Sequence, residues 1–274
     1  MHFDLLQTIS LNGSPNTAND DRAGASGALA WVIDGATDLS EPGLLGQQGG
    51  AAWLSSAANT AFAGNTAPGL LQTCTQVFAQ VETRFHAEKR RDVTAIWEVP
   101  SAAFAAVQLV GNAIEVAWAA DCAVLLATAD GCHWCTPEPN TADEAADALA
   151  LGPGTGTQSV RTPEVLADRR KSRSRTDRRV LNTDAKASGA SSSFNRFPVT
   201  NGDHVLLMSD GFSCLINPFA RYDAASLVHA VREKGLATLA QEIRQIERED
   251  AACERYPRFK VSDDATALWL RISD

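Results

Sequence analysis

Short apolar runs that end at Gly, Asn or Asp recur along the chain, a pattern typical of buried β-strands. The runs lie at 3–10, 27–33, 102–110, 114–119, 123–128, 205–208 and 265–272. A hairpin-type turn, Gly111-Asn112, separates two of them. We therefore predict that residues 102–128 form a meander of antiparallel strands.

Four longer segments have apolar residues at helical spacing or are rich in Ala, Leu and Gln, and we predict helices there. They are Leu44–Phe62, Pro68–Lys89, Ala224–Lys234 and Leu236–Cys253. Along the chain, strands are followed by two helices, more strands, two helices and a last strand. This order favours an α+β fold of stacked layers over an alternating βαβ fold.

Residues 136–196 differ from the rest because Pro, Gly, Ser, Thr and charged residues replace the apolar runs. We predict a single domain over 1–274 in which this segment is a flap insertion with short helices. The segment holds the only basic run of the chain, from Arg169 to Arg179. Two interpretations stay open: a solvated face of the flap, or a face toward a phosphoprotein substrate or an acidic metal site, since Arg suits phosphate.

Composition narrows the class of protein. Of 274 residues, 45% are hydrophobic and 21% charged, which is ordinary for a soluble globular protein. The net charge of −9 argues against binding to nucleic acid. The six Cys lack the regular spacing of a disulfide framework, so we predict free thiols and a location in the reducing cytoplasm. Neither a signal peptide nor a membrane span is expected, and the high Ala content indicates a bacterial source.

Four aspartate motifs carry the candidate chemistry. They are Asn19-Asp20-Asp21-Arg22, Asp34-Gly35, Ser209-Asp210-Gly211 and Asp263-Asp264-Ala265-Thr266. One Asp-Gly alone indicates a turn. Three of the four motifs adjoin an apolar run, however, and carboxylates gathered at strand ends suit hard divalent cations. The set predicts a two-metal site for phosphate-ester hydrolysis, with Asp34, Asp210 and Asp263 as its core.

The motifs, in this order, resemble those of the metal-dependent protein phosphatases, the PPM or type 2C family. The resemblance covers nearly the whole chain. It rests first on the four aspartate motifs and on the apolar runs that adjoin three of them. It rests also on a segment similar to the family's central Gly-Asp-Ser segment, which reads Trp118-Ala119-Ala120-Asp121-Cys122-Ala123. It implies a four-layer αββα sandwich of two antiparallel sheets flanked by helices, with metals in a cleft at one end of the sheets.

The resemblance also implies roles for individual residues. Asp34 would bridge two Mn²⁺ or Mg²⁺ ions, the Gly35 carbonyl would help to hold one of them, and Asp210 and Asp263 would complete the shell of the other. A water between the ions would attack phosphorus directly, without a phospho-enzyme. The substrate would be a protein phosphorylated on Ser or Thr, and the enzyme would oppose a Ser/Thr kinase in signalling.

Further acidic residues match the family's pattern less closely. Asp20 and Asp21 stand at its acidic pair, which binds a metal directly or through water. Asp121 matches a carboxylate that helps to bind a third metal in bacterial members, although Ala120 and Cys122 alter the segment around it.

Two departures affect the chemistry. The family's phosphate-binding Arg would stand at position 16, where this chain has Asn16. Arg22 is a candidate substitute, and a structural role for Arg22 is the alternative. No His follows Asp34-Gly35 to serve as a general acid, since Ala36-Thr37-Asp38 comes next. A catalytically weak or inactive regulatory or binding module of the same fold is therefore the second hypothesis.

Other motifs carry weaker signals. Haloacid-dehalogenase phosphatases need an Asp-x-Asp nucleophile motif, which is absent from Asp34-Gly35-Ala36-Thr37. We therefore exclude that class of phosphatase. Cys132 and Cys135 form a lone Cys-x-x-Cys without the second pair that a zinc site needs. Gly152–Gly156 is rich in Gly but lacks the Gly-Lys-Ser/Thr of a P-loop.

Overall fold

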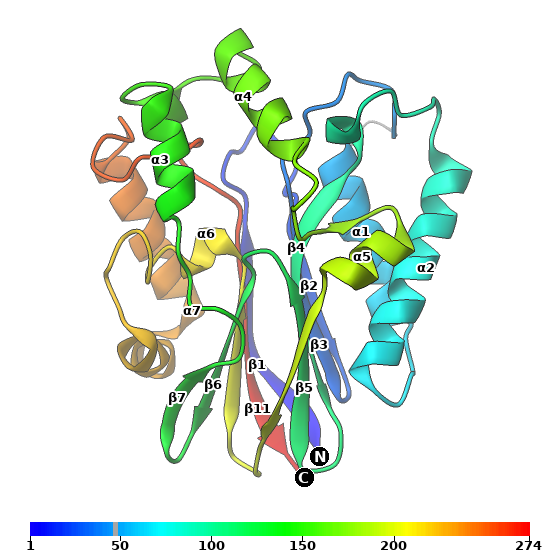
Figure 1. The fold of residues 1–274 in the computed structure, drawn as a ribbon. Coiled ribbons are helices and arrows are strands. Elements are labelled where there is room, and N and C mark those ends of the chain that lie inside the picture. The colour runs from blue at the N-terminus through cyan, green and yellow to red at the C-terminus, as the bar shows by residue number, and fades with distance from the viewer. Residues whose placement is uncertain (46–48) are drawn as a thin grey trace.

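The computed structural model describes residues 1–45 and 49–274, and its strands form two antiparallel sheets (Figure 1). The first sheet has the order β1-β11-β10-β6-β7. Its strands are β1 (His2–Leu11), β11 (Ala265–Ser273), β10 (His204–Met208), β6 (Ala123–Thr128) and β7 (Gly131–Trp134). The second has the order β2-β3-β4-β5-β9, with β8 (Leu181–Asn182) paired to β4. Its other strands are β2 (Arg22–Ser26), β3 (Leu29–Gly35), β4 (Ser101–Leu109), β5 (Ala113–Ala119) and β9 (Ser193–Pro198).

Helices cover the outer face of each sheet, which confirms the predicted αββα sandwich (Figure 1). α1 (Gly50–Ala63) and α2 (Leu70–Glu88) pack on the β3–β4 side, with α5 (Ala185–Ser191) against α2. α6 (Asp210–Ser213) and α7 (Ala224–Glu249) pack on the β10–β11 side. A third apolar cluster, including Val32, Val107, Val205 and Leu268, fills the space between the sheets. The central strands β3, β4, β10 and β11 are therefore buried on both faces.

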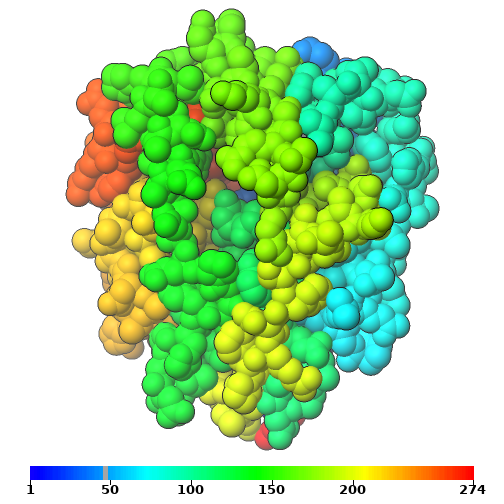
Figure 2. Space-filling model, viewed as in Figure 1, coloured from blue at the N-terminus to red at the C-terminus, as the bar shows by residue number. Residues whose placement is uncertain are grey.

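The flap segment, which we define as residues 136–180, contains α3 (Ala142–Ala150) and α4 (Pro163–Arg173). Short 3₁₀ turns occur at Thr155–Thr157 within it and at Ile96–Glu98 before β4. α4 lies at the top of the molecule between its two halves (Figure 1), and the flap segment covers the upper part of one face (Figure 2). Among the described residues, no helix is long and apolar enough to cross a membrane.

The predicted meander over 102–128 is wrong at its third strand. β4 and β5 do form a hairpin, but β6 leaves their sheet and pairs with β10 and β7. The chain changes sheets at Ala120, which has a positive φ of 63°, and at Asp121. This change of sheet carries Asp121 to the end of the sandwich where the other acidic motifs lie.

Other differences are smaller. β2 and β7 were not predicted, and β9 occupies the end of the expected flap because residues 193–198 pair with β5. The two helices predicted at Ala224–Lys234 and Leu236–Cys253 are confirmed within α7, where Gly235 separates them with non-helical φ and ψ of 78° and 160°. Residues 46–48 of the helix predicted over Leu44–Phe62 lie outside the described residues, and α1 begins at Gly50.

Candidate metal centre

Strand ends from both sheets meet at one end of the sandwich. β10 and β11 are antiparallel neighbours with Met208 opposite Ala267, so Asp210 after β10 lies near Asp263 before β11. β3 ends at Asp34 in the other sheet. The charge of Asp210 acts on Asp34, so the two carboxyl groups lie near each other although they belong to different sheets. The fold thus joins acidic residues that are far apart in the sequence.

These acidic residues line a cavity of about 1000 Å³ that the flap segment partly encloses. The residues predicted as ligands that line it are Asp20, Asp34, Gly35, Asp121, Asp210 and Asp263. Asp21 is only 1% exposed, and its charge acts on Asp34. Six of the seven predicted ligands therefore line this cavity, and Asp21 is buried close to one of them, Asp34.

The carboxyl groups resist losing their protons in this environment. Burial, and next the charge of Asp210, raises the pKa of Asp34 well above its usual range. Burial does the same to the pKa of Asp210, and neighbouring carboxylates add to the effect. Burial also raises the pKa of Asp20 to about 6 and that of Asp21 to about 7. Carboxyl groups crowded in this way take up protons or cations to offset their mutual repulsion.

Carboxylate oxygens without hydrogen-bond partners indicate that a cation, rather than a proton, would neutralise these acidic residues. Among the described residues, both carboxylate oxygens of Asp21 and Oδ1 of Asp210 are buried without a hydrogen-bond partner. A buried carboxylate oxygen without a donor costs free energy unless a cation contacts it. Oxygen ligands of this kind suit Mg²⁺ and Mn²⁺. The donor set therefore fits hard divalent ions.

The ligand set is not closed in this structure. Within residues 1–45 and 49–274, no three His, Cys, Asp or Glu side chains converge to hold one ion. Oδ1 of Asp263 accepts a hydrogen bond from Nζ of Lys260 at 2.6 Å. One predicted ligand therefore already has a cationic partner within the chain.

Two glycines allow the backbone to approach the acidic residues. A Cβ at Gly211 would overlap the carbonyl oxygen of Asp264. A Cβ at Gly35 would stand 2.8 Å from the carbonyl oxygen of Asp20 and 2.9 Å from that of Ala51, closer than normal packing allows. The glycines after Asp34 and Asp210 are thus required for close packing between motifs, beyond any role in a turn.

Asp264 has a structural role that the sequence did not reveal. Its Oδ1 accepts a hydrogen bond from the Gly13 amide at 2.7 Å, and its Oδ2 accepts one from the Asp20 amide at 2.6 Å. The last motif therefore fixes the loop that carries the first one.

Arg22 does not line the cavity. Its guanidinium Nη1 donates to the carbonyl oxygens of Asn19, at 2.7 Å, and Asp21, at 2.6 Å. Arg22 thus supports the backbone of its own motif, and this geometry lends no support to the phosphate contact considered for it. Asn16 is exposed and is not among the cavity-lining residues either.

The flap segment is tied to the loop that follows Asp34-Gly35. Arg170 lies over the Trp97 ring, 3.8 Å from its centroid, and its Nη2 donates to the Leu39 carbonyl at 2.9 Å. Nη1 of Arg173 donates to the Thr37 carbonyl at 2.7 Å. α4 therefore holds down the segment between β3 and α1.

The same helix also contacts the other half of the molecule. The guanidinium of Arg169 lies over the Phe259 ring, 3.5 Å from its centroid, and pairs with Asp147 at 3.2 Å. Since Phe259 belongs to the loop between α7 and β11, α4 bridges the two halves above the cavity. Of the two interpretations of the basic run, the arrangement favours the one that turns it toward the acidic site.

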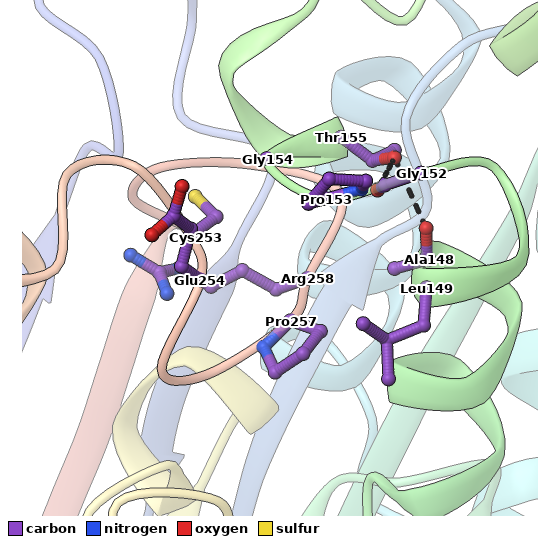
Figure 3. Close-up of a pocket in the computed structure, with 10 residues that line it drawn as sticks. All are labelled: Ala148, Leu149, Gly152, Pro153, Gly154, Thr155, Cys253, Glu254, Pro257 and Arg258. Atoms are coloured by element: carbon purple, nitrogen blue, oxygen red, sulfur yellow. Dashed lines mark hydrogen bonds between the residues drawn. The ribbon is translucent and has the colours of Figure 1, made fainter.

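A second cavity, of about 350 Å³, lies beside the flap segment between Gly152–Thr155 and the loop 253–258 (Figure 3). On its wall, the Thr155 hydroxyl donates to the carbonyls of Ala148 and Gly152. Glu254 and Arg258 are its charged lining residues. This cavity lacks the gathered carboxylates of the first.

Several solved structures with the same fold are protein phosphatases. The serine/threonine phosphatase PstP/Ppp of Mycobacterium tuberculosis matches with a TM-score of 0.59 at 14% identity, covering 100% of both chains. The catalytic domain of PstP in complex with 2 manganese ions matches at 0.58 and 14%, covering 100% of this chain and 99% of that one. The PPM Ser-Thr phosphatase MsPP of Mycobacterium smegmatis matches at 0.55 and 18%, covering 98% and 99%.

The chain thus has the fold of the bacterial PPM-type Ser/Thr phosphatases over its whole length. The resemblance inferred from the aspartate motifs is confirmed at the level of the fold. No protein-family model matches the sequence, and no curated protein is similar enough in sequence to match.

Proposed function

We propose that this protein is a metal-dependent phosphatase of proteins phosphorylated on Ser or Thr. The observation that supports this most is the cluster of buried carboxyl groups around Asp34 and Asp210, with unsatisfied oxygens on Asp21 and Asp210, in the main cavity of a phosphatase fold. Buried acidic groups with raised pKa values in a cavity are typical of a functional site.

Two Mn²⁺ or Mg²⁺ ions are the proposed cofactors, in line with the manganese-bound PstP structure. Asp34, the Gly35 carbonyl, Asp210 and Asp263 would hold them, with Asp20 and Asp21 as direct or water-mediated ligands. A third ion at Asp121 is a further option. When bound, such ions supply positive charge that lowers the pKa of water and stabilises a phosphoryl group under attack.

The chain's own residues orient this chemistry. Asp264 fixes the Asp20 loop, and Gly211 lets Asp210 approach Asp263. Arg170 and Arg173 hold the loop after Asp34 in place. The attacking water would then meet the phosphate inside a cavity that α4 shields.

The setting of the reaction follows from the same proposal. The substrate would be a phosphoprotein made by a Ser/Thr kinase, and the enzyme would act in bacterial signalling. The six cysteines are all free in the structure, including the three between residues 122 and 135. Free cysteines suit a reducing compartment, which supports a cytoplasmic location.

A second candidate is a binding or regulatory module that has lost turnover. Two observations favour it: Asn16 is not among the cavity-lining residues, and Lys260 takes up an oxygen of Asp263. Such a module would bind a partner with its fold intact but would not hydrolyse phosphate esters.

Hydrolysis of a phosphoserine peptide, with and without Mn²⁺, decides between the two candidates. We expect Mn²⁺-dependent release of phosphate that EDTA abolishes and that falls by about 100-fold or more in Asp34→Ala and Asp210→Ala. Asp130→Asn, at an exposed position remote from the cavity lining, serves as the control and should retain wild-type activity. Full activity in Asp34→Ala would exclude the proposed function, and an inactive wild type would favour the binding module.

A further inference from the structure

A phosphate monoester carries two negative charges, so its site needs cationic groups in addition to metals. Neither Asn16 nor Arg22 supplies one to this cavity, for the reasons given above. The cationic residues that do line it are Lys260 and four arginines of the flap segment, Arg169, Arg173, Arg175 and Arg178. The partners of these groups show which of them is available to a ligand.

Four of the five groups already have partners. Lys260 pairs with Asp263 at 2.6 Å, Arg169 with Asp168 at 2.7 Å and Arg175 with Asp177 at 2.7 Å. Arg173 donates to the Thr37 carbonyl at 2.7 Å. Each of these side chains holds the cavity wall or a neighbouring charge.

Arg178 differs from the other four. Among the described residues, it has neither a hydrogen-bond acceptor nor an ion-pair partner within bonding distance, although it is partly buried and lines the cavity. Burial lowers the pKa of its guanidinium, while the charge of Asp121 opposes this effect. Arg178 and Asp121 line the same cavity, so Arg178 stands near an acidic residue with donors to spare.

We propose that Arg178 binds the phosphoryl group of the substrate in place of the family's missing N-terminal arginine. This inference rests on the proposed function, since it names the substrate group that the same cavity receives. A guanidinium suits the role because its planar donors match two phosphate oxygens at once. Arg169, Arg170 and Arg173 are by contrast already engaged with protein groups.

The neighbouring residue provides a matched control. Arg179 differs by one position, carries the same charge and points elsewhere: its Nε donates to the Ser191 carbonyl at 3.1 Å and its Nη2 to the Ser193 hydroxyl at 2.9 Å. It is not among the cavity-lining residues. Substitution at 179 removes the same charge from the chain without removing it from the cavity.

Calorimetric titration of inorganic phosphate into the Mg²⁺-loaded protein tests the inference without relying on turnover. Arg178→Ala should weaken binding by about 10- to 100-fold, as expected for a lost charge-assisted pair of hydrogen bonds. Arg178→Lys should recover part of the affinity. Arg179→Ala should stay within about twofold of the wild type, and equal melting temperatures of the variants would show that they fold.

Turnover of a phosphoserine peptide separates this inference from the proposed function. In an active enzyme, Arg178→Ala should raise KM by about tenfold or more, with a smaller effect on kcat. Phosphate binding that depends on Arg178 in an inactive wild type would uphold the inference and reject the function. Equal phosphate affinity and KM in wild type and Arg178→Ala, or no phosphate binding by wild type, would overturn the inference.

Discussion

Nζ of Lys260 lies 2.6 Å from Oδ1 of Asp263, so a cation of the chain itself contacts a residue expected to bind metal. Burial alone would lower the pKa of Lys260, but the carboxylates of Asp263, Asp34 and Asp210 outweigh it and raise this pKa. The ammonium group therefore partly neutralises the acidic cluster. Both side chains keep an open face, with 42% of Lys260 and 35% of Asp263 exposed.

Replacing Lys260 should strengthen metal binding. Lys260→Met removes the ammonium group beside Oδ1 of Asp263 and with it a positive charge that repels an incoming cation, so we expect about tenfold tighter binding of Mn²⁺. Calorimetric titration of Mn²⁺ measures this change. Lys186→Met, on an exposed position of α5, should leave the affinity unchanged. Equal or weaker Mn²⁺ binding by Lys260→Met would show that the ion pair does not compete with the metal.

The acidic cluster should destabilise the metal-free protein. Asp210→Asn keeps the shape of the side chain but removes a buried charge next to Asp34, so we expect the free energy of unfolding in EDTA to rise by about 1–3 kcal/mol. Urea denaturation at pH 7.5 measures it. Mn²⁺ should stabilise the wild type but not this variant. A less stable Asp210→Asn protein in EDTA would contradict the account, and Asp130→Asn, at an exposed site, should change little.

Stability without metal should fall as pH rises. The folded-state pKa values of Asp20, about 6, and Asp21, about 7, exceed the ordinary value of 3.8. Between about pH 4 and 7 the folded chain therefore binds more protons than the unfolded chain, and its free energy of unfolding decreases with increasing pH. We expect a decrease on the order of a few kcal/mol, measured by urea denaturation in EDTA from pH 5 to 7.5.

Two comparisons make the pH dependence specific. Asp21→Asn should flatten the slope, because the substituted side chain does not titrate. Structural ion pairs affect stability in a lower pH range. The pKa of Glu98 is lowered to about 2, chiefly by Arg91. The contribution of Glu98 to the free energy of unfolding is therefore complete above about pH 4.5 and is lost only below that pH. Stability that is constant or rises between pH 5 and 7.5 in EDTA would refute the assignment.

The close approach at Gly211 should be intolerant of a side chain. Gly211→Ala would push the added Cβ against the Asp264 carbonyl and displace the segment that holds Asp263 and the Asp20 loop. We expect a loss of about 2 kcal/mol or more in stability and markedly weaker Mn²⁺ binding. Gly189→Ala, where nothing lies within 4 Å, should be neutral or slightly stabilising. Thermal unfolding and Mn²⁺ titration of both variants check this, and wild-type behaviour of Gly211→Ala would contradict it.

The sequence predicted the acidic ends of β3 and β10 because each apolar run stops where its Asp begins. It did not predict that β6 changes sheets, since the apolar run 123–128 is equally suited to either sheet. Which neighbour a buried strand pairs with depends on the whole assembly, not on its own residues. The gathering of Asp121 with the other acids was therefore accessible only through the resemblance.

The contacts of individual charged side chains were also beyond prediction. Lys260 stands close to Asp263 in sequence, yet nothing in the spacing distinguishes an ion pair from a solvated charge. In the sequence, the flap arginines form one basic run. Only the structure shows that Arg169 packs on Phe259 and Arg170 on Trp97, whereas Arg178 has no such contact among the described residues. Chain packing thus gives similar residues in one run different roles.

Anomalous diffraction from crystals grown with Mn²⁺ tests the central claim most directly, because it locates manganese without reference to activity. We expect two manganese peaks in the large cavity, both in contact with Asp34, with Asp210 and Asp263 beside one of them and Lys260 turned away from Asp263. An empty cavity at saturating Mn²⁺, or manganese bound only at other carboxylates, would contradict the account.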